Sequence, residues 1–141
     1  MDETLTDLAT RLRRGVMRLS RRLRFSAVGS LSPGQVSILG WLDQNESLTL
    51  GELATHEQVR PPSITPLVNA LRSQEFVACA KDEVDRRSTR VVITDRGRRE
   101  LNVIRRRRTE FLERRLLTLS PAERQKAVEL VAFLETLLEE E

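Results

Sequence analysis

Two short apolar runs, at residues 76–81 (FVACAK) and 89–93 (TRVVI), constrain the fold of this chain more than any other feature. The residues between them, 82–88, are mostly charged and include Arg86 and Arg87. Short apolar runs on either side of a polar turn are typical of a β-hairpin. The sequence therefore predicts two antiparallel strands over about 76–94, joined by a loop that projects positive charge from a rigid base.

Helix-start patterns account for most of the remaining chain. Ser32, Thr49 and Ser120 are each followed three residues later by Gln or Glu, the capping box that begins a helix. Two prolines after Arg60 open another helix, and amphipathic repeats indicate the rest. The predicted order is four helices, two strands and two helices. The helices are expected at residues 4–25, 33–45, 50–57, 62–74, 95–118 and 121–138.

The two short helices directly before the hairpin have the proportions of a helix-turn-helix. Followed by a hairpin, they predict a winged helix. The expected fold class is therefore mainly α with a small β-hairpin, built as a single domain over residues 1–141. Residues 32–97 form the winged helix-turn-helix, and residues 1–28 and 100–141 flank it as N- and C-terminal dimerisation helices.

The expectation of a dimer comes from the outer helices. Each carries a leucine stripe that the small central module is too small to cover. Burying these stripes against a second copy is the commonest solution, so we expect a two-fold homodimer. A monomeric bundle folded on itself is the alternative.

Composition argues against several classes of protein. A single cysteine, Cys79, permits no intrachain disulfide and is expected to be buried and structural, and with one histidine no metal site is predicted. No nucleophile–base spacing or glycine-rich phosphate loop is present, so neither an enzyme nor a cofactor site is expected. No apolar run is long enough to cross a membrane, and the acidic N-terminus lacks a signal core, which predicts a cytoplasmic protein.

Positive charge is concentrated in the middle of the chain. The net charge is only +3, yet residues 60–99 hold nine Lys or Arg against five Asp or Glu. Residues 29–59, by contrast, hold four acids and no Lys or Arg. A cationic surface between acidic segments is typical of a protein that binds a polyanion.

The helix over 62–74 has one face suited to reading DNA. At about 100° per residue, Ile64, Leu67, Val68 and Leu71 share one side, and short uncharged residues occupy the other. Such a face fits a major groove, where Asn pairs with adenine and Ser or Thr accept several partners. An ordinary surface helix would carry more Lys and Glu. The predicted DNA-binding residues here are Arg60, Pro62, Ser63, Thr65, Pro66, Asn69 and, at a phosphate, Arg72.

The hairpin loop supplies a second candidate contact. Arg86 at its tip is suited to an adjacent minor groove, where negative potential is concentrated. Asp85 is expected to hold Arg87 or Arg90 through a bidentate pair. A charged loop is often merely solvated, but the helix-turn-helix before it favours DNA. The predicted wing residues are Asp85, Arg86, Arg87, Ser88 and Arg90. The arginine run at 105–108 is instead expected to pair with acids of the terminal helices.

Four segments resemble the MarR family of transcriptional regulators: 32–35 (SPGQ), 50–54 (LGELA), 61–65 (PPSIT) and, most specifically, 85–97 (DRRSTRVVITDRG). The resemblance covers essentially the whole chain. It implies a homodimeric winged helix-turn-helix repressor that binds double-stranded DNA at a pseudo-palindromic operator. It also implies a small phenolic or lipophilic effector between the dimer arms and the winged lobe.

The chain departs from the family pattern at two positions. Pro66 stands where such helices often have a polar or basic residue, which removes a possible contact and a backbone N–H. Glu75 replaces the glycine that usually ends the recognition helix, so that turn must be made without the easy left-handed residue.

Two other functions stay open. A non-specific architectural nucleic-acid binder would bind any duplex equally. A helical protein-interaction adaptor would bind no DNA at all. The uncharged face over 62–74 argues against the architectural binder, and the acidic segments 29–59 and 119–141 are what would support the adaptor.

Overall fold

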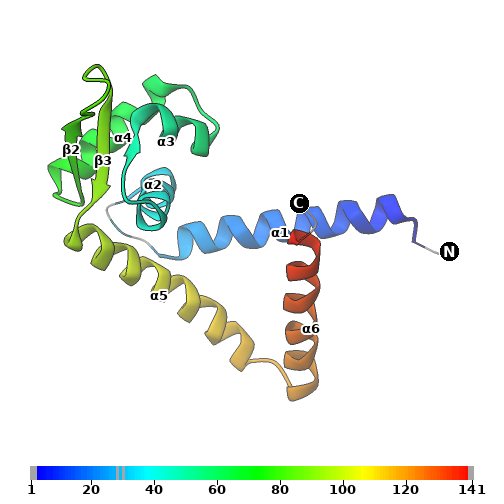
Figure 1. The fold of residues 1–141 in the computed structure, drawn as a ribbon. Coiled ribbons are helices and arrows are strands. Elements are labelled where there is room, and N and C mark those ends of the chain that lie inside the picture. The colour runs from blue at the N-terminus through cyan, green and yellow to red at the C-terminus, as the bar shows by residue number, and fades with distance from the viewer. Residues whose placement is uncertain (1–2, 28, 30, 140–141) are drawn as a thin grey trace.

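The computed structural model describes residues 3–27, 29 and 31–139. It confirms the mainly helical fold with a small antiparallel sheet (Figure 1). The elements in chain order are α1 (Leu5–Ser26), α2 (Pro33–Gln44), β1 (Leu48–Thr49), α3 (Leu50–Glu57), α4 (Pro61–Ser73), β2 (Val77–Lys81), β3 (Thr89–Ile93), α5 (Asp95–Leu117) and α6 (Pro121–Leu138).

The sheet corrects the predicted order of elements. It has three strands rather than two, in the order β1-β3-β2, because the two residues of β1 pair antiparallel with β3. Leu48 lies opposite Val91, and both side chains are buried. The expected hairpin is confirmed as β2 and β3, with Val77 opposite Ile93 and Lys81 opposite Thr89.

The helix starts follow the local sequence closely. At Ser32, Thr49 and Ser120 the hydroxyl accepts from the backbone N–H three residues on, and that residue's side chain accepts in return. α1 begins with the same arrangement at Thr4, and Thr94 accepts from Gly97 N at 3.0 Å to begin α5. These bonds satisfy backbone donors that a helix terminus leaves unpaired, which is why the starts could be predicted.

The hydrophobic core lies in the winged lobe, between α2, α3, α4, the sheet and the first half of α5. Each helix contributes the apolar face that its periodicity predicts. The largest fully buried side chains are Ile38, Leu39, Leu42, Leu53, Ile64, Leu71, Val91, Leu101 and Ile104.

Two close backbone contacts fix the hairpin against α4 and α5. After α4 the chain turns at Glu75, whose φ of 62° is left-handed, and Phe76 N donates to Leu71 O at 3.0 Å. Phe76 O in turn accepts from Thr94 N, and a Cβ added to Gly97 would lie 2.1 Å from that oxygen. Glycine is therefore required at residue 97 by close approach of the backbone.

α1, α5 and α6 outline an open triangle beside the winged lobe (Figure 1). α1 packs against α5, but within the described residues no side chain of α1 or α6 is buried. Large apolar side chains remain exposed along both helices, among them Leu5, Leu8, Met17, Val128, Val131, Phe133 and Leu138.

Candidate DNA-binding site

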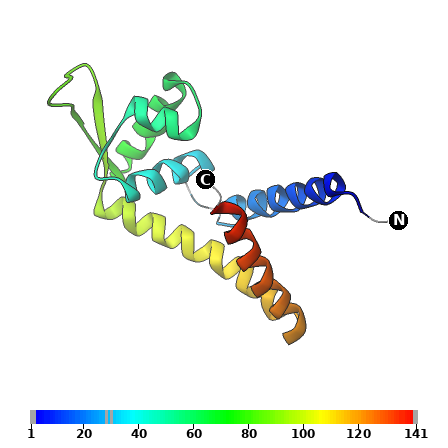
Figure 2. The same cartoon turned by 45° about the vertical axis from the view of Figure 1, so that its right-hand side comes forward.

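The candidate site is the solvent-facing side of α4 together with the loop between β2 and β3. The loop stands at the end of the winged lobe that is away from α5 (Figure 2). The predicted phase of α4 is confirmed, because Ile64, Val68 and Leu71 are buried. Leu67 is half-buried against the core. The opposite side exposes Pro62, Ser63, Thr65, Pro66, Asn69 and Ser73.

The turn before α4 holds this helix in place. Gln58 adopts a left-handed conformation with φ 56°, and its N–H closes the end of α3. Val59 N donates to Ala54 O at 3.0 Å, which fixes the next step of the turn. α4 then begins with Pro61 and Pro62 in its first turn, where the missing N–H groups cost nothing.

Pro66 lies inside α4 and is exposed. Its ring removes one N–H from the helix ladder, yet the helix continues to Ser73. The exposed side of α4 therefore presents ring carbons of two prolines between short hydroxyl and amide groups, with no charge at its centre.

Two arginines border this side of α4. Arg60 precedes the first turn and Arg72 lies near the last, and both are exposed. Among the described residues neither side chain makes an ion pair. Both guanidinium groups are therefore available to an anion at the edges of the uncharged face.

The loop between β2 and β3 does not pair its charges as expected. Asp85 contacts Arg87 through one oxygen, at 3.3 Å from Nε and 3.1 Å from the backbone N, so the pair is not bidentate. Arg90 is held by Asp82 instead, with Nε 3.1 Å from Oδ1. Arg86 is exposed, and Ser88 closes the turn by donating its N–H to Asp85 O at 2.9 Å.

Asp82 is the wing residue that sequence reasoning missed. The hydrogen bond from Arg90 lowers the pKa of the Asp82 carboxyl, and the backbone N–H groups of Asp85 and Val84 lower it further. The carboxylate therefore stays ionised at neutral pH. An acid inside a charged loop gives no signal of this role, because its partner is identified only once the strand register is known.

Arg105, the first arginine of the run on α5, pairs differently from the prediction. Arg105 and Arg98 both bind Asp43 of α2, at 2.9 and 3.2 Å, rather than acids of the terminal helices. Hydrogen bonding from Arg105 is the main reason that the pKa of Asp43 is lowered. Asp43 thereby joins the winged lobe to α5.

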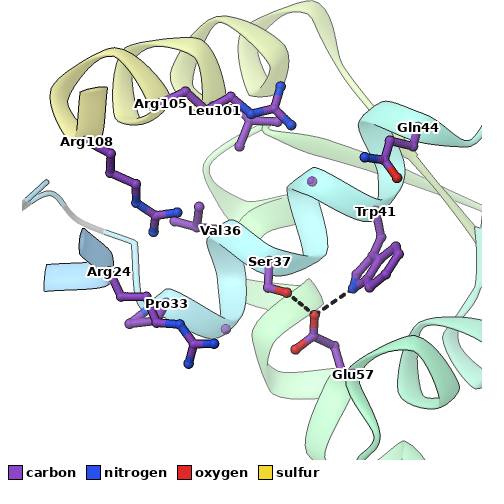
Figure 3. Close-up of a pocket in the computed structure, with 12 residues that line it drawn as sticks. Arg24, Pro33, Val36, Ser37, Trp41, Gln44, Glu57, Leu101, Arg105 and Arg108 are labelled. Atoms are coloured by element: carbon purple, nitrogen blue, oxygen red, sulfur yellow. Dashed lines mark hydrogen bonds between the residues drawn. The ribbon is translucent and has the colours of Figure 1, made fainter. Parts of the chain in front are cut away.

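A cavity of about 440 Å³ lies between α2, α5 and the end of α1 (Figure 3). Arg24, Arg105 and Arg108 line one side of it. The Nε of Arg108 is buried without a hydrogen-bond partner. Burial lowers the pKa of Arg108, and the positive charges of Arg24 and Arg105 lower it further. This side of the cavity therefore gathers positive charge, and among the described residues no carboxylate forms an ion pair with Arg108.

The other side of the cavity is bound to the end of α3. Trp41 Nε1 donates to Glu57 Oε1 at 2.9 Å, and the Ser37 hydroxyl donates to the same oxygen (Figure 3). The Trp41 ring also stacks on His56, with centroids 4.4 Å apart. Since Glu57 ends α3, these contacts join the cavity wall to the turn that precedes α4.

Other candidate chemistry is not assembled in the described part of the chain. Cys79 is half-buried rather than buried, and it lies opposite Val91 in the sheet against the core. No cluster of three or more potential metal ligands occurs among the described residues. None of the helices in the described ranges is long and apolar enough to cross a membrane.

Known proteins resemble this chain in both sequence and fold. A model of the MarR family matches residues 31–89. An uncharacterized HTH-type transcriptional regulator of Mycobacterium bovis is 41% identical over 118 residues, which cover 83% of this chain and 82% of that protein. The crystal structure of a protein of Pseudomonas aeruginosa, assigned as a transcriptional regulator, matches with a TM-score of 0.82 and 31% identity, over 98% of this chain and 100% of that one.

The fold is also shared with a MepR variant of S. aureus that is bound to an oligodeoxyribonucleotide. Its TM-score is 0.68 at 19% identity, over 92% of this chain and 97% of that one. The lobe and its hairpin thus define a winged helix-turn-helix protein. The chain belongs to the MarR family, and it is a DNA-binding transcriptional regulator of that family.

Proposed function

We propose that this protein is a sequence-specific, dimeric repressor that inserts α4 into the major groove. The observation that carries the proposal is the uncharged, exposed side of α4 beside a loop of exposed arginines. Short hydroxyl and amide groups on this side let the helix approach base edges closely, and both kinds of group form hydrogen bonds with those edges.

The individual contacts follow from the positions of the side chains. Asn69 is suited to adenine, and Ser63 and Thr65 accept or donate to several bases. Arg60 and Arg72 are placed for phosphates, which position the protein without reading sequence. The wing residues Arg86 and Arg87 lie against the neighbouring minor groove, Asp85 and Ser88 hold the turn that carries them, and Arg90 lies at its base.

The terminal helices form the interface of the proposed homodimer. The exposed apolar side chains of α1 and α6 support this, because a second copy can bury them. Residues 1–28 and 100–141 then serve dimerisation, with Leu101 and Ile104 of the second range also packed in the core of the lobe, and residues 32–97 serve DNA binding. A two-fold dimer would bind a pseudo-palindromic operator with half-sites about 10 bp apart, or a multiple of that.

The cavity beside α2 is the proposed site of an effector that relieves repression. The three arginines on its wall favour a small aromatic molecule that carries an acidic group, rather than a neutral lipophilic one. The chain contains one tryptophan and no tyrosine, so Trp41 fluorescence reports on this cavity directly. Titration with benzoate should change that fluorescence in the natural protein and not in Arg108→Gln.

A competition gel shift tests the proposed function. Purified protein is bound to DNA from upstream of its own gene, and unlabelled bulk DNA is added in excess. The complex should survive the competitor. Equal displacement from any duplex would identify an architectural binder, and no complex even at low salt would identify a protein-interaction adaptor.

A further inference from the structure

The carboxylate of Asp82 links the two ends of the loop between β2 and β3. Asp82 begins this loop, and its side chain is only 16% exposed. Oδ1 accepts from Arg90 Nε at 3.1 Å, and Oδ2 accepts from Asp85 N at 3.4 Å. The backbone N of Asp82 also donates to Ser88 O at 2.9 Å. Asp82 therefore joins both arms of the loop and the first residue of its tip.

Arg90 extends this connection into the body of the lobe. Its Nη1 donates to Ser47 Oγ at 2.9 Å, and Ser47 lies in the segment between α2 and β1. Arg90 also lies opposite Thr49 in the pairing of β1 with β3. The loop is thus connected through Asp82, Arg90 and Ser47 to a part of the lobe that is 35 or more residues earlier in the chain.

The other acid–arginine pair of the loop does not reach the body of the lobe. Asp85 and Arg87 are two residues apart, and the Arg87 side chain is 93% exposed. An exposed pair of this kind contributes little to a fixed position. The backbone ladder places the hairpin as a whole, and among the side chains of the described loop the connection through Asp82 links its tip to the body of the lobe.

We infer that Asp82 is a positioning residue for DNA binding, which acts by holding the loop so that Arg86 and Arg87 reach the DNA that α4 occupies. The inference rests on the proposed function, since it requires the loop to contact DNA. It assigns to Asp82 and Arg90 a different task from Arg86: they orient the contact, and Arg86 makes it.

The direction in which DNA affinity changes when Asp82 is removed separates a positioning role from simple electrostatics. A carboxylate close to DNA repels phosphate, so removing it should tighten binding if charge alone matters. If Asp82 positions the loop, removing it should weaken binding although the protein becomes more positive. Glu83 is the matched control, because it is the next residue of the same loop and its exposed carboxylate joins no ion pair in the described structure.

The experiment compares Asp82→Ala with Glu83→Ala in the full-length protein, on one duplex and at several salt concentrations. Asp82→Ala should bind about fivefold or more weakly, within the range expected for losing a wing contact. Glu83→Ala should bind as tightly as the natural protein or more tightly. Ser47→Ala changes no charge and should weaken binding in the same direction. Thermal melting of each variant checks that the lobe remains folded.

A double-mutant cycle with Arg86→Ala identifies what Asp82 acts through. The loss caused by Arg86→Ala should shrink in the Asp82→Ala background and stay the same in the Glu83→Ala background. If Arg86→Ala weakens binding while Asp82→Ala binds equally or more tightly, the positioning role is wrong and the proposed function stands. If Arg86→Ala alone has no effect, the wing contact itself is wrong, and the positioning role fails with it.

Discussion

Replacing Glu75 with glycine should stabilise the protein. Glu75 holds a φ of 62° at the end of α4, where an L-residue costs about 1–2 kcal/mol relative to a right-handed conformation. Glycine removes that cost but loses about 0.4–1 kcal/mol more backbone entropy on folding. The ion pair with Arg96 is 3.6 Å long and the Glu75 side chain is 80% exposed, so its loss matters little. The net gain should be about 0.5–1 kcal/mol, which raises the melting temperature by about 2–4 °C.

The assay is thermal unfolding followed by circular dichroism at one fixed protein concentration, because association shifts the melting temperature. Glu75→Ala is the control, since it removes the ion pair and keeps the left-handed strain. Its melting temperature should match that of the natural protein or lie slightly below it. If alanine stabilises as much as glycine, or glycine destabilises, the strain at this turn is not what the backbone geometry indicates.

Three further outcomes follow from other parts of the structure. Gly97→Ala should destabilise the protein by about 1–3 kcal/mol in chemical unfolding, because the added Cβ meets a backbone oxygen. Gly15→Ala, with open space around it, should stabilise the protein by about 0.5–1 kcal/mol. Equal effects of the two variants would refute the steric requirement at residue 97. The lowered pKa of Asp43 means that the ionised carboxylate stabilises the protein fully above the ordinary pKa of 3.8, and that this stabilisation is lost as the pH falls below that value. Asp43→Asn should therefore be less stable than the natural protein at pH 7 and should lose less stability on acidification. Parallel curves of stability against pH would contradict this. Asn69→Ala should cost about 1–3 kcal/mol at one operator base pair and relax specificity there, whereas Arg72→Ala should weaken all duplexes alike and reduce the salt slope by about one; the reverse pattern would exchange their roles.

Local signals made most of the fold predictable. Capping boxes at Ser32, Thr49 and Ser120 involve residues three apart, so the local sequence alone predicts where those helices begin. The apolar phase of α4 follows from its periodicity, and the hairpin follows from two apolar runs around a charged turn. The sequence predicts that the turn after α4 is made without the usual glycine, and the structure shows that Glu75 itself adopts the left-handed conformation there.

Features that depend on distant residues were not predictable. β1 has two residues, too few for any periodicity, and it exists because Leu48 pairs with Val91. The partner of Arg105 proved to be Asp43, which is 62 residues earlier. Likewise, Arg90 is bound by Asp82 and Ser47 rather than by Asp85, because strand register decides which loop residues face each other.

The most direct test of dimeric, sequence-specific DNA binding is selection of bound duplexes from a random-sequence pool by the purified protein, with bulk DNA present. We predict enrichment of a two-fold symmetric site, its half-sites separated by about one helical turn or a multiple of it, with two chains bound per duplex. Recovery of unenriched sequence, or of a lone half-site bound by one chain, would contradict it.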